Sequence, residues 1–340
     1  MDSIRFQKRV FARLHVAVFG RCLATVMTCL FATTAATAAE PWPGRPIKII
    51  VPVTAGGVVD LAARVLAPKL SQELGQSVVV ENRPGAEMII GTGAVAHSAP
   101  DGYTWLLATS SSLTNVPLLK RVNYDGPNAF EVVSRIGYVS QAVLVPRSLG
   151  VNTLAELVAL AKSNPRMLNY AHVGSGSIGQ LNTFLFAREA GIDIQPVSYK
   201  GGSAILADLL SNRVNLAVLP SATAAPLIKE GKLVALGVVG TGRSTVLPHT
   251  PTLQEMHYFS VNLVGWLGIM VPKGTPAPII RRANAAVTSA QNDPLVRNRL
   301  RMMDISVETT SSPDIVSAQV RKEVESMTKL FKAANIQPER

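Results

Sequence analysis

Two loops rich in glycine and hydroxyl residues are the segments of this sequence best suited to hold a small anion. Thr54-Ala55-Gly56-Gly57 and Gly174-Ser175-Gly176-Ser177 each follow a short apolar run and precede a segment with helical periodicity. Helix N-termini offer free N–H groups and a partial positive charge, which receive carboxylates and phosphates. Either loop alone fits an ordinary tight turn, but two such loops facing each other across a cleft favour a binding site.

Three titratable or charged residues beside these loops are further candidates for ligand contact. Asp60 lies in the first turn of the expected helix, where the alternative role is to complement the helix dipole. Arg83 follows a strand and is either a fork for a carboxylate or an exposed loop residue. His172 ends a strand at the second loop, and ligand contact and a solvated or core-edge position remain equally open.

The residues that catalysis or a cofactor would need do not form a recognisable pattern. Gly174, Gly176 and Gly179 match the spacing of a dinucleotide-binding loop, but Ser198-Tyr199-Lys200 stands where an acid is expected. No G-x-S-x-G elbow occurs, and the histidines after the first 39 residues form no closely spaced pair. We therefore expect no catalytic residue, no cofactor and no metal site, and a nicotinamide-dependent dehydrogenase is disfavoured.

Residues 1–39 have the pattern of a cleaved secretory signal peptide. Five basic residues and one acid precede an uncharged apolar stretch, and small residues end it at an Ala36-x-Ala38 cleavage motif. The stretch is interrupted by threonines and is too short for a membrane span. Both cysteines, Cys22 and Cys29, lie within it, and neither stands at a lipoprotein cleavage position. We expect a soluble periplasmic protein without disulfides.

The charge of the remaining chain argues against a nucleic-acid partner. Of 33 basic and 22 acidic residues, the first 39 positions hold five and one, which leaves a net charge of +7. No block of five like charges occurs and aromatic residues are few, whereas nucleic-acid binding needs a basic stripe or stacking aromatics. A modest positive field is compatible with an anionic ligand.

Short apolar strands alternate with helical segments, which predicts a two-lobed α/β fold with the ligand in the cleft between the lobes. Each lobe is expected to be a doubly wound, mostly parallel sheet with flanking helices. We expect residues 40–141 plus 264–340 in the first lobe and 142–263 in the second, with crossings near 140–145 and 264–271. Strands are expected at 47–53, 77–80, 103–108, 142–145, 168–171, 195–198, 214–218, 233–239 and 267–271, and helices at 58–74, 89–98, 153–163, 180–190, 203–211, 222–230, 276–292, 294–302 and 313–334.

Six segments in a fixed order and spacing form a recurring set of motifs. They are Pro52-Val53-Thr54-Ala55-Gly56-Gly57 with Asp60, Glu81-Asn82-Arg83-Pro84-Gly85-Ala86, Pro100-Asp101-Gly102-Tyr103-Thr104, Asn169-Tyr170-Ala171 with Gly174-Ser175-Gly176-Ser177, Tyr199-Lys200-Gly201-Gly202, and Val271-Pro272 with Gly274-Thr275-Pro276. Over about residues 40–335 the chain thereby resembles the tripartite tricarboxylate transporter receptors, the TctC or Bug (Bordetella uptake) family.

The resemblance implies a type II periplasmic-binding fold that closes on a small carboxylic acid and delivers it to the permease subunits of a membrane transporter. One carboxylate is then held largely by backbone N–H groups and bridging waters in the first lobe. The ligand-binding residues expected on this basis are Thr54, Ala55, Gly56, Gly57, Asp60, Asn82, Arg83, Pro84, Ala86, Thr109, Ser110, His172, Gly174, Ser175, Gly176, Ser177, Tyr199 and Lys200.

The sequence departs from the family pattern at four places around the expected pocket. Val58-Val59 replaces a small polar pair, and Glu87-Met88-Ile89 replaces Gly-Gly-Asn. Gln180 stands where a histidine is common, and Leu219 where an acid is frequent. These changes remove polar contacts and add bulk and one carboxylate. We therefore expect a monocarboxylate with an apolar or aromatic body rather than a ligand with two strongly held carboxylates.

Three classes of function fit these features. A monomeric transport receptor that serves a tripartite tricarboxylate-type transporter is favoured. A ligand-dependent sensor partner of a membrane signalling protein shares every sequence feature, so only identification of the membrane partner separates the two. An exported enzyme is the least favoured class.

Overall fold

The structure, a computed structural model, describes residues 42–309, 312–333 and 336–338. The chain from Pro43 onward belongs to one compact unit, and the expected signal peptide lies outside the described residues. The strands are β1 (Ile47–Val51), β2 (Val78–Asn82), β3 (Thr104–Thr109), β4 (Phe130–Val139), β5 (Gln141–Pro146), β6 (Asn169–His172), β7 (Gln195–Ser198), β8 (Leu216–Pro220), β9 (Leu233–Val239), β10 (Gly265–Pro272) and β11 (Ile305–Val307).

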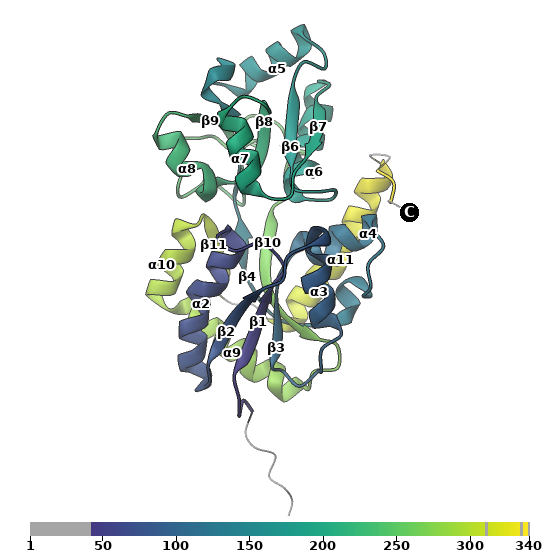
Figure 1. The fold of residues 1–340 in the computed structure, drawn as a ribbon, viewed down its shortest axis with the longest axis vertical. Helices are drawn as coiled ribbons and strands as arrows, with labels where there is room; N and C mark the ends of the chain where they lie inside the picture. The colour runs from purple at the N-terminus through teal and green to yellow at the C-terminus, as the bar shows by residue number, and fades with distance from the viewer. Residues whose placement is uncertain (1–41, 310–311, 334–335, 339–340) are drawn as a thin grey trace, which may run out of the picture. The chain divides into compact units, whose positions relative to one another are not determined.

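Helices alternate with these strands along most of the chain (Figure 1). The α-helices are α2 (Val58–Leu74), α3 (Ile89–Ala96), α4 (Val116–Leu119), α5 (Leu154–Ser163), α6 (Ile178–Ala190), α7 (Gly202–Leu210), α8 (Ser221–Lys229), α9 (Ala277–Asn292), α10 (Pro294–Met302) and α11 (Pro313–Ala333). Short helical turns are η1 (Ala86–Met88), η2 (Ser111–Asn115), η3 (Gly126–Ala129) and η4 (Arg147–Leu149).

Two sheets form the framework of the molecule. The six-stranded sheet has the order β11-β4-β10-β3-β1-β2, and the five-stranded sheet has the order β7-β6-β8-β5-β9. Around the six-stranded sheet, α2, α9 and α10 lie on one side, and α3 and α11 lie on the other (Figure 1). Helices α5 to α8 surround the five-stranded sheet. The predicted two-lobed α/β fold is confirmed.

Each sheet combines parallel and antiparallel pairs, although the sequence predicts mostly parallel sheets. Strand β1 pairs in parallel with β2 and β3, and β6 pairs in parallel with β7 and β8. The antiparallel pairs all involve β4, β10 and β11 in one sheet and β5 and β9 in the other. Their cause is the connection between the sheets, because strands that pass from one sheet to the other run against the parallel part.

The strand β4 is absent from the sequence prediction, because polar residues break its apolar pattern. Glu131, Ser134 and Arg135 interrupt the run, and Ser134 and Arg135 are nevertheless buried. Strand β4 ends at Val139 and β5 begins at Gln141, so the chain passes from the first sheet to the second within a single residue. The return passage runs from β9 to β10.

Several helices follow their sequence signals closely. Helix α2 has the predicted bounds, and Leu66 and Leu70 on its inner face are fully buried. Helix α5 begins after Thr153, whose hydroxyl accepts the Glu156 N–H at 3.2 Å, as an N-cap does. The Glu156 carboxylate accepts the N–H of Asn152 rather than that of Thr153, so the capping box is shifted by one residue.

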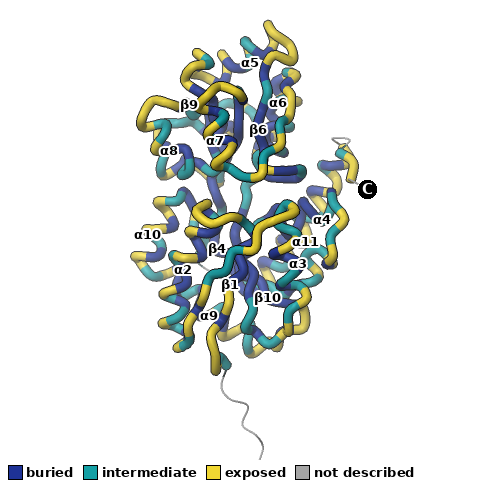
Figure 2. Tube along the Cα trace, in the orientation of Figure 1, coloured by how far each residue is buried: buried dark blue, intermediate teal, exposed yellow. Residues whose placement is uncertain are grey.

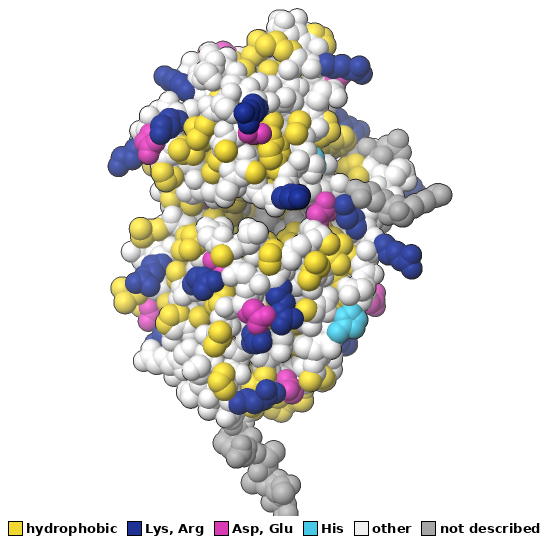
Figure 3. Space-filling view, viewed as in Figure 1, with side chains coloured by type: hydrophobic (Ala, Val, Ile, Leu, Met, Phe, Trp, Pro, Cys, Tyr) yellow, Lys and Arg dark blue, Asp and Glu magenta, His cyan; other side chains and the backbone are white. Residues whose placement is uncertain are grey.

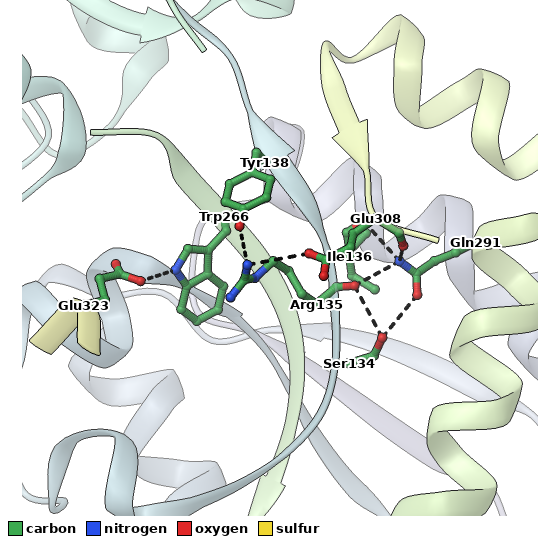
Figure 4. Close-up of polar contacts among 8 residues, drawn as sticks. All are labelled: Ser134, Arg135, Ile136, Tyr138, Trp266, Gln291, Glu308 and Glu323. Carbon is green, nitrogen blue, oxygen red and sulfur yellow. Dashed lines mark hydrogen bonds and ion pairs between the residues drawn. The ribbon is translucent and has the colours of Figure 1, made fainter. Parts of the chain in front are cut away.

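A buried polar cluster lies where β4, β10 and α11 meet (Figure 4). Arg135 is 2% exposed, and its guanidinium carbon lies 5.0 Å and 5.6 Å from the ring centres of Tyr138 and Trp266. These distances are those of cation–π contacts. A carboxylate oxygen of Glu308 lies 3.6 Å from the guanidinium. The Trp266 indole N–H donates to Glu323 at 2.6 Å, and burial raises the pKa of Glu323 despite this hydrogen bond.

The C-terminal helix α11 contacts elements of both sheets. Val316 and Val320 belong to the same buried cluster as residues of β1, β3 and β10. Further along α11, Met327 and Phe331 pack in a cluster that contains Leu181 of α6. Figure 2 shows long buried stretches in both sheets, and β8 and β10 are almost wholly buried, whereas the edge strand β7 is mostly exposed. The helix therefore connects the packing of the two sheets beyond the two strand crossings.

The surface carries mixed charge. Figure 3 shows Lys and Arg side chains scattered over the visible face among acidic and apolar groups, without one continuous basic stripe. In the described part of the chain, no His, Cys, Asp or Glu residues gather in a group of three that would suit a metal ion. None of the helices in that part combines the length and the hydropathy that a membrane span needs.

Candidate functional site

The loop between β1 and α2 is organised by a buried carboxylate. Residues 54–57 are exposed, whereas Asp60 is only 1% exposed. Its Oδ2 accepts the Gly56 N–H at 2.9 Å, and its Oδ1 accepts the Asn82 side-chain amide at 2.9 Å. Arg64 Nε lies 3.0 Å and 3.1 Å from the two carboxylate oxygens. Asp60 therefore holds its own loop in place, a role that neither sequence interpretation contained.

The charge of Asp60 is stabilised by these partners. Burial alone would raise the pKa of the Asp60 carboxyl, but the hydrogen bonds from Arg64, Gly56 and Asn82 outweigh it and hold the pKa below its ordinary value. Gly57 occupies the N-cap position of α2 and supplies no side-chain cap. The loop is thus fixed from within, while the helix N-terminus keeps the character of an anion site.

The loop after β2 is hydrogen-bonded to the β1–α2 loop through Asn82, whereas Arg83 points to the exposed surface. Asn82 donates to the Val53 carbonyl at 3.1 Å in addition to Asp60. Arg83 pairs with Glu81 at 2.5 Å on the exposed surface. This placement matches the alternative of an exposed loop arginine rather than a carboxylate fork.

The backbone after Pro84 is strained. Pro84 and Ala86 are exposed, and Ala86, Glu87 and Met88 have φ angles of 42°, 52° and 77°. The left-handed conformation costs on the order of 1 kcal/mol for each residue other than glycine. The motif that this segment resembles has glycines at positions 87 and 88, and the backbone conformation explains that preference. In this chain, two long side chains occupy a backbone suited to glycine.

The end of β3 brings Thr109 next to the strained segment. Thr109 Oγ1 accepts the Ser112 N–H at 3.1 Å and lies 3.5 Å from the Met88 sulfur. Ser110 is 1% exposed, and its carbonyl accepts the Thr114 hydroxyl at 2.6 Å. Thr109 is therefore half-buried beside the loops of the six-stranded sheet, and Ser110 lies beneath the surface.

The loop between β6 and α6 is largely hydrogen-bonded within itself. The Gly174 N–H donates to His172 Nδ1 at 3.2 Å, and the Ser177 N–H donates to the Gly174 carbonyl at 3.2 Å. The Gly176 N–H donates to the Gln180 side chain at 2.7 Å. Ser177 is the N-cap of α6 and accepts the Gln180 N–H. Three backbone N–H groups of this loop thus donate hydrogen bonds to other residues of the chain. The N-terminus of α2 differs, because it has no side-chain cap.

The glycine spacing of this loop has a structural explanation. Gly174 and Gly176 adopt φ angles of 120° and 77°, which side chains rarely adopt. A Cβ on Gly179 would lie 2.3 Å from the Val218 carbonyl oxygen, so glycine allows α6 to approach β8 closely. The match to a dinucleotide-binding loop therefore follows from local backbone shape and helix–strand packing.

The surroundings of His172 lower its pKa. This residue is 7% exposed, and burial lowers its pKa, although the negative charge of Glu87 acts in the opposite direction. Its Nδ1 accepts a backbone N–H, which places the ring proton on Nε2. The His172 carbonyl accepts the Tyr199 N–H at 2.8 Å, which links the two loops of this sheet.

Tyr199 and Lys200 both lie just before α7, but the Tyr199 side chain is bonded to α7 whereas Lys200 is exposed. The Tyr199 hydroxyl donates to the Asp208 carboxylate of α7 at 2.7 Å. Burial and the adjacent Asp208 carboxylate raise the pKa of Tyr199 to about 12. Lys200 is exposed. The tyrosine hydroxyl is thus committed to its own lobe, and the lysine ammonium is the accessible group of the pair.

Two residues from helical turns beside the six-stranded sheet touch the loop 174–177 directly. The Asn115 side chain of η2 donates to the Gly176 carbonyl at 2.9 Å. The carboxyl group of Glu87 lies so close to Gly174 that a Cβ there would be 2.7 Å from it. Glu87 also forms an ion pair of 3.0 Å with Lys120. These contacts bring the two loop systems together at Gly174 and Gly176.

A small cavity lies on the α6 side of the loop 174–177. Its volume is about 130 Å³. Ser175 and Gln180 supply its polar lining and Phe184 and Tyr170 its aromatic lining, together with Leu119, Leu181, Ile336 and Gln337. Ser175 is the only residue of the predicted site that lines this cavity.

The structure therefore groups the predicted residues into two sets. Gly56, Asp60 and Asn82 form one hydrogen-bonded group, and His172, Gly174, Ser177 and Tyr199 form the other. Leu219 is 5% exposed and packs in the core of the five-stranded sheet. Alternation along β8 turns its side chain towards that core. The expectation that Leu219 makes the pocket less polar stays a prediction.

Three residues outside the expected ligand-binding set lie where the two sets meet. Glu87, Asn115 and Lys120 make the contacts described above. For Glu87 a signal was present, since an acid occupies a position where the motif has glycine. Asn115 and Lys120 lie in no motif, and only the packing of η2 and α4 reveals them.

Two sheets joined by two strand crossings, with a helix N-terminus that has no side-chain cap, are the features expected of a solute-binding protein. Residues 62–336 match the family described as tripartite tricarboxylate transporter family receptor. The chain belongs to this family, and the resemblance found in the sequence motifs is confirmed.

Particular relatives show how closely the chain follows this family. It is 36% identical to protein BugT of Bordetella pertussis over 277 residues, which cover 81% of this chain and 83% of BugT. Its fold matches the structure of the periplasmic binding protein BugD with a TM-score of 0.81, 30% identity and coverage of 88% and 100%. It matches Rpa4515 of R. palustris, solved with adipate, with a TM-score of 0.81, 33% identity and coverage of 88% and 100%.

Proposed function

We propose that the chain is an exported receptor that captures a small organic acid in the periplasm and delivers it to the permease of a tripartite tricarboxylate-type transporter. The family membership and the adipate-bound relative support this function. The observation that carries it is the loop 54–57, which Asp60 fixes from within at an α2 N-terminus without a side-chain cap. Such a terminus stabilises a carboxylate through N–H groups and the helix dipole.

The rest of the proposal concerns export and organisation. Residues 1–39 act as a signal peptide and are removed, and residues 40–141 with 264–340 form one lobe around residues 142–263. The ligand lies between the loop 54–57 and the loop 174–177, with Lys200 accessible at the second lobe. Val59 and Met88 are half-buried near the first loops and favour an acid with an apolar or aromatic body over a strongly charged one.

Substitution of Gly57 by leucine tests the carboxylate site. Gly57 has a φ of −80°, which any residue adopts, and a Cβ there meets nothing within 4 Å. Gly57→Leu therefore folds normally but places a side chain over the N–H groups of α2. We expect at least a tenfold loss of affinity for the best acid of a carboxylate panel, measured by calorimetry.

Gly242→Leu is the matched control, because Gly242 is an exposed glycine whose added Cβ also meets nothing within 4 Å. It should keep the native affinity. Equal affinities for both variants would show that the carboxylate is not held at the α2 N-terminus.

The membrane partner distinguishes transport from sensing. Both functions need the same ligand site, so binding measurements alone do not separate them. Crosslinking of the ligand-loaded protein in membranes, followed by mass spectrometry, should recover a permease subunit. Recovery of a signalling protein instead would support the sensor function.

A further inference from the structure

The side chain of Glu87 reaches the loop of the opposite sheet. Its carboxyl carbon and Oε1 would both lie 2.7 Å from a Cβ added at Gly174, so the group rests on the Gly174 backbone. Gly174 is buried by this contact. A carboxylate thus already occupies the position facing the second-lobe loop, and it belongs to the protein.

Two neighbouring groups of suitable polarity surround this carboxylate. Lys120 lies 3.0 Å from Glu87 Oε2. His172 accepts a hydrogen bond through Nδ1 from the N–H of Gly174, the residue on which Glu87 rests. A cation, an imidazole and a glycine backbone would suit a ligand carboxylate equally well. Glu87 therefore takes up the partners that a second ligand carboxylate would use.

The backbone at this position makes the arrangement unusual. Glu87 and Met88 have φ angles of 52° and 77°, which glycine adopts without strain. Strained residues persist where their side chains or surroundings compensate, and they concentrate at functional sites. At Glu87 the compensating contact is the one with Gly174 and Lys120.

We infer that Glu87 is a specificity-determining residue, a built-in anion that excludes a second carboxylate from the loop 174–177. The ligand then carries one carboxylate, held at the loop 54–57, and a neutral group towards Gly174. Like charges a few ångströms apart in a partly desolvated site repel strongly, which gives the exclusion its physical basis. The inference rests on the proposed function, because it concerns selection among carboxylic acids.

Adipate and hexanoate provide a matched pair of probes, since both have six carbons and differ by one terminal carboxylate. Three variants are compared with the native mature protein by calorimetry. Glu87→Gln removes the charge and keeps the shape, and Glu87→Gly also relieves the left-handed backbone. Glu131→Gln is the control, because Glu131 of β4 forms its ion pair with Lys273, the residue after β10, and its loss changes the net charge equally.

We expect the ratio of adipate to hexanoate affinity to rise at least tenfold in both Glu87 variants and to stay within twofold in Glu131→Gln. An unchanged ratio in the Glu87 variants would overturn the inference, as would an equal loss of both acids. If the native protein binds neither acid, a gain of adipate binding on Glu87→Gly supports the inference and its absence contradicts it. Failure of the proposed function is recognised separately, by a lack of response to any member of the wider carboxylate panel.

Discussion

Replacement of Asp60 by asparagine separates the structural role of this carboxylate from a direct role in ligand binding. In the native chain, Asp60 accepts from the Gly56 N–H, the Asn82 amide and Arg64. Asparagine keeps the size but has one acceptor oxygen and an NH₂ group. Its oxygen can therefore accept from either Gly56 or Asn82, in addition to Arg64, while its NH₂ group must face the other of these two donors.

The expected loss of stability follows from this count. A hydrogen bond to a charged group contributes about 1.5–3 kcal/mol, and one between neutral groups about 1 kcal/mol. In Asp60→Asn one of the hydrogen bonds to Asp60 is lost and a second becomes a weaker bond between neutral groups. The ion pair with Arg64 is given little weight, because the Arg64 side chain is 48% exposed and solvent screens it. Water also reaches the exposed Gly56. We expect Asp60→Asn to lower the free energy of unfolding by about 2 kcal/mol, which corresponds to roughly 3 °C in Tm for a chain of about 300 residues.

The pH dependence of this loss has a definite sign. In the folded protein the pKa of Asp60 lies below the ordinary value of an aspartate. Its contribution to stability is therefore complete above about pH 5 and is lost as pH falls through the folded-state pKa. The difference in Tm between the native protein and Asp60→Asn should be constant near neutral pH and should shrink below about pH 4.

Calorimetric unfolding across this pH range, with Asp193→Asn as the control, tests the reasoning. Asp193 pairs with Arg166 on the surface, so its replacement should change stability by less than about 0.5 kcal/mol. An Asp60→Asn protein as stable as the native one at pH 7, with the same carboxylate affinity, would show that the loop does not depend on Asp60.

Three further predictions concern packing, buried charge and export. Gly179→Ala should destabilise the protein by about 2–3 kcal/mol in urea unfolding, because the added Cβ would overlap the Val218 carbonyl. The control Gly202→Ala should be neutral or stabilising, because the space around Gly202 is open. Glu323 has a raised pKa, so its contribution to stability is present at low pH and is lost as pH rises through the folded-state pKa; Glu323→Gln should abolish this part of the Tm–pH profile. Mass spectrometry of the periplasmic fraction should find a chain that begins near Ala39 or Glu40; an intact N-terminus would contradict cleavage.

Elements with strong local signals could be predicted from the sequence. The bounds of α2, α10, β7 and β9 agree with the prediction, because apolar periodicity and proline or glycine punctuation mark them clearly. The strand β4 could not be recognised, since the burial of Arg135 depends on Trp266 and Glu308, which lie far away in the sequence. The three-residue strand β11 is too short to leave a pattern.

The site shows the same division between local and long-range information. The two glycine loops follow from their residue types and from their places after strands. The direction of each polar side chain does not, because Asp60 turns towards Gly56 and Gln180 towards Gly176 only through the folded backbone. The contact between Glu87 and Gly174 depends on the packing of two sheets against each other, which no local pattern encodes.

The position of α11 has a mechanical consequence for ligand capture. Its first half packs on the six-stranded sheet, and Met327 and Phe331 in its second half pack with Leu181 of α6. A rotation that carries Gly174 away from Glu87 must therefore separate Phe331 from Leu181 or pull the end of α11 from the first sheet. Exposing two such side chains costs about 3–6 kcal/mol, enough to shift a conformational equilibrium at least a hundredfold. The packing of the C-terminal helix thus stabilises the arrangement in which Gly174 contacts Glu87, even before a ligand binds.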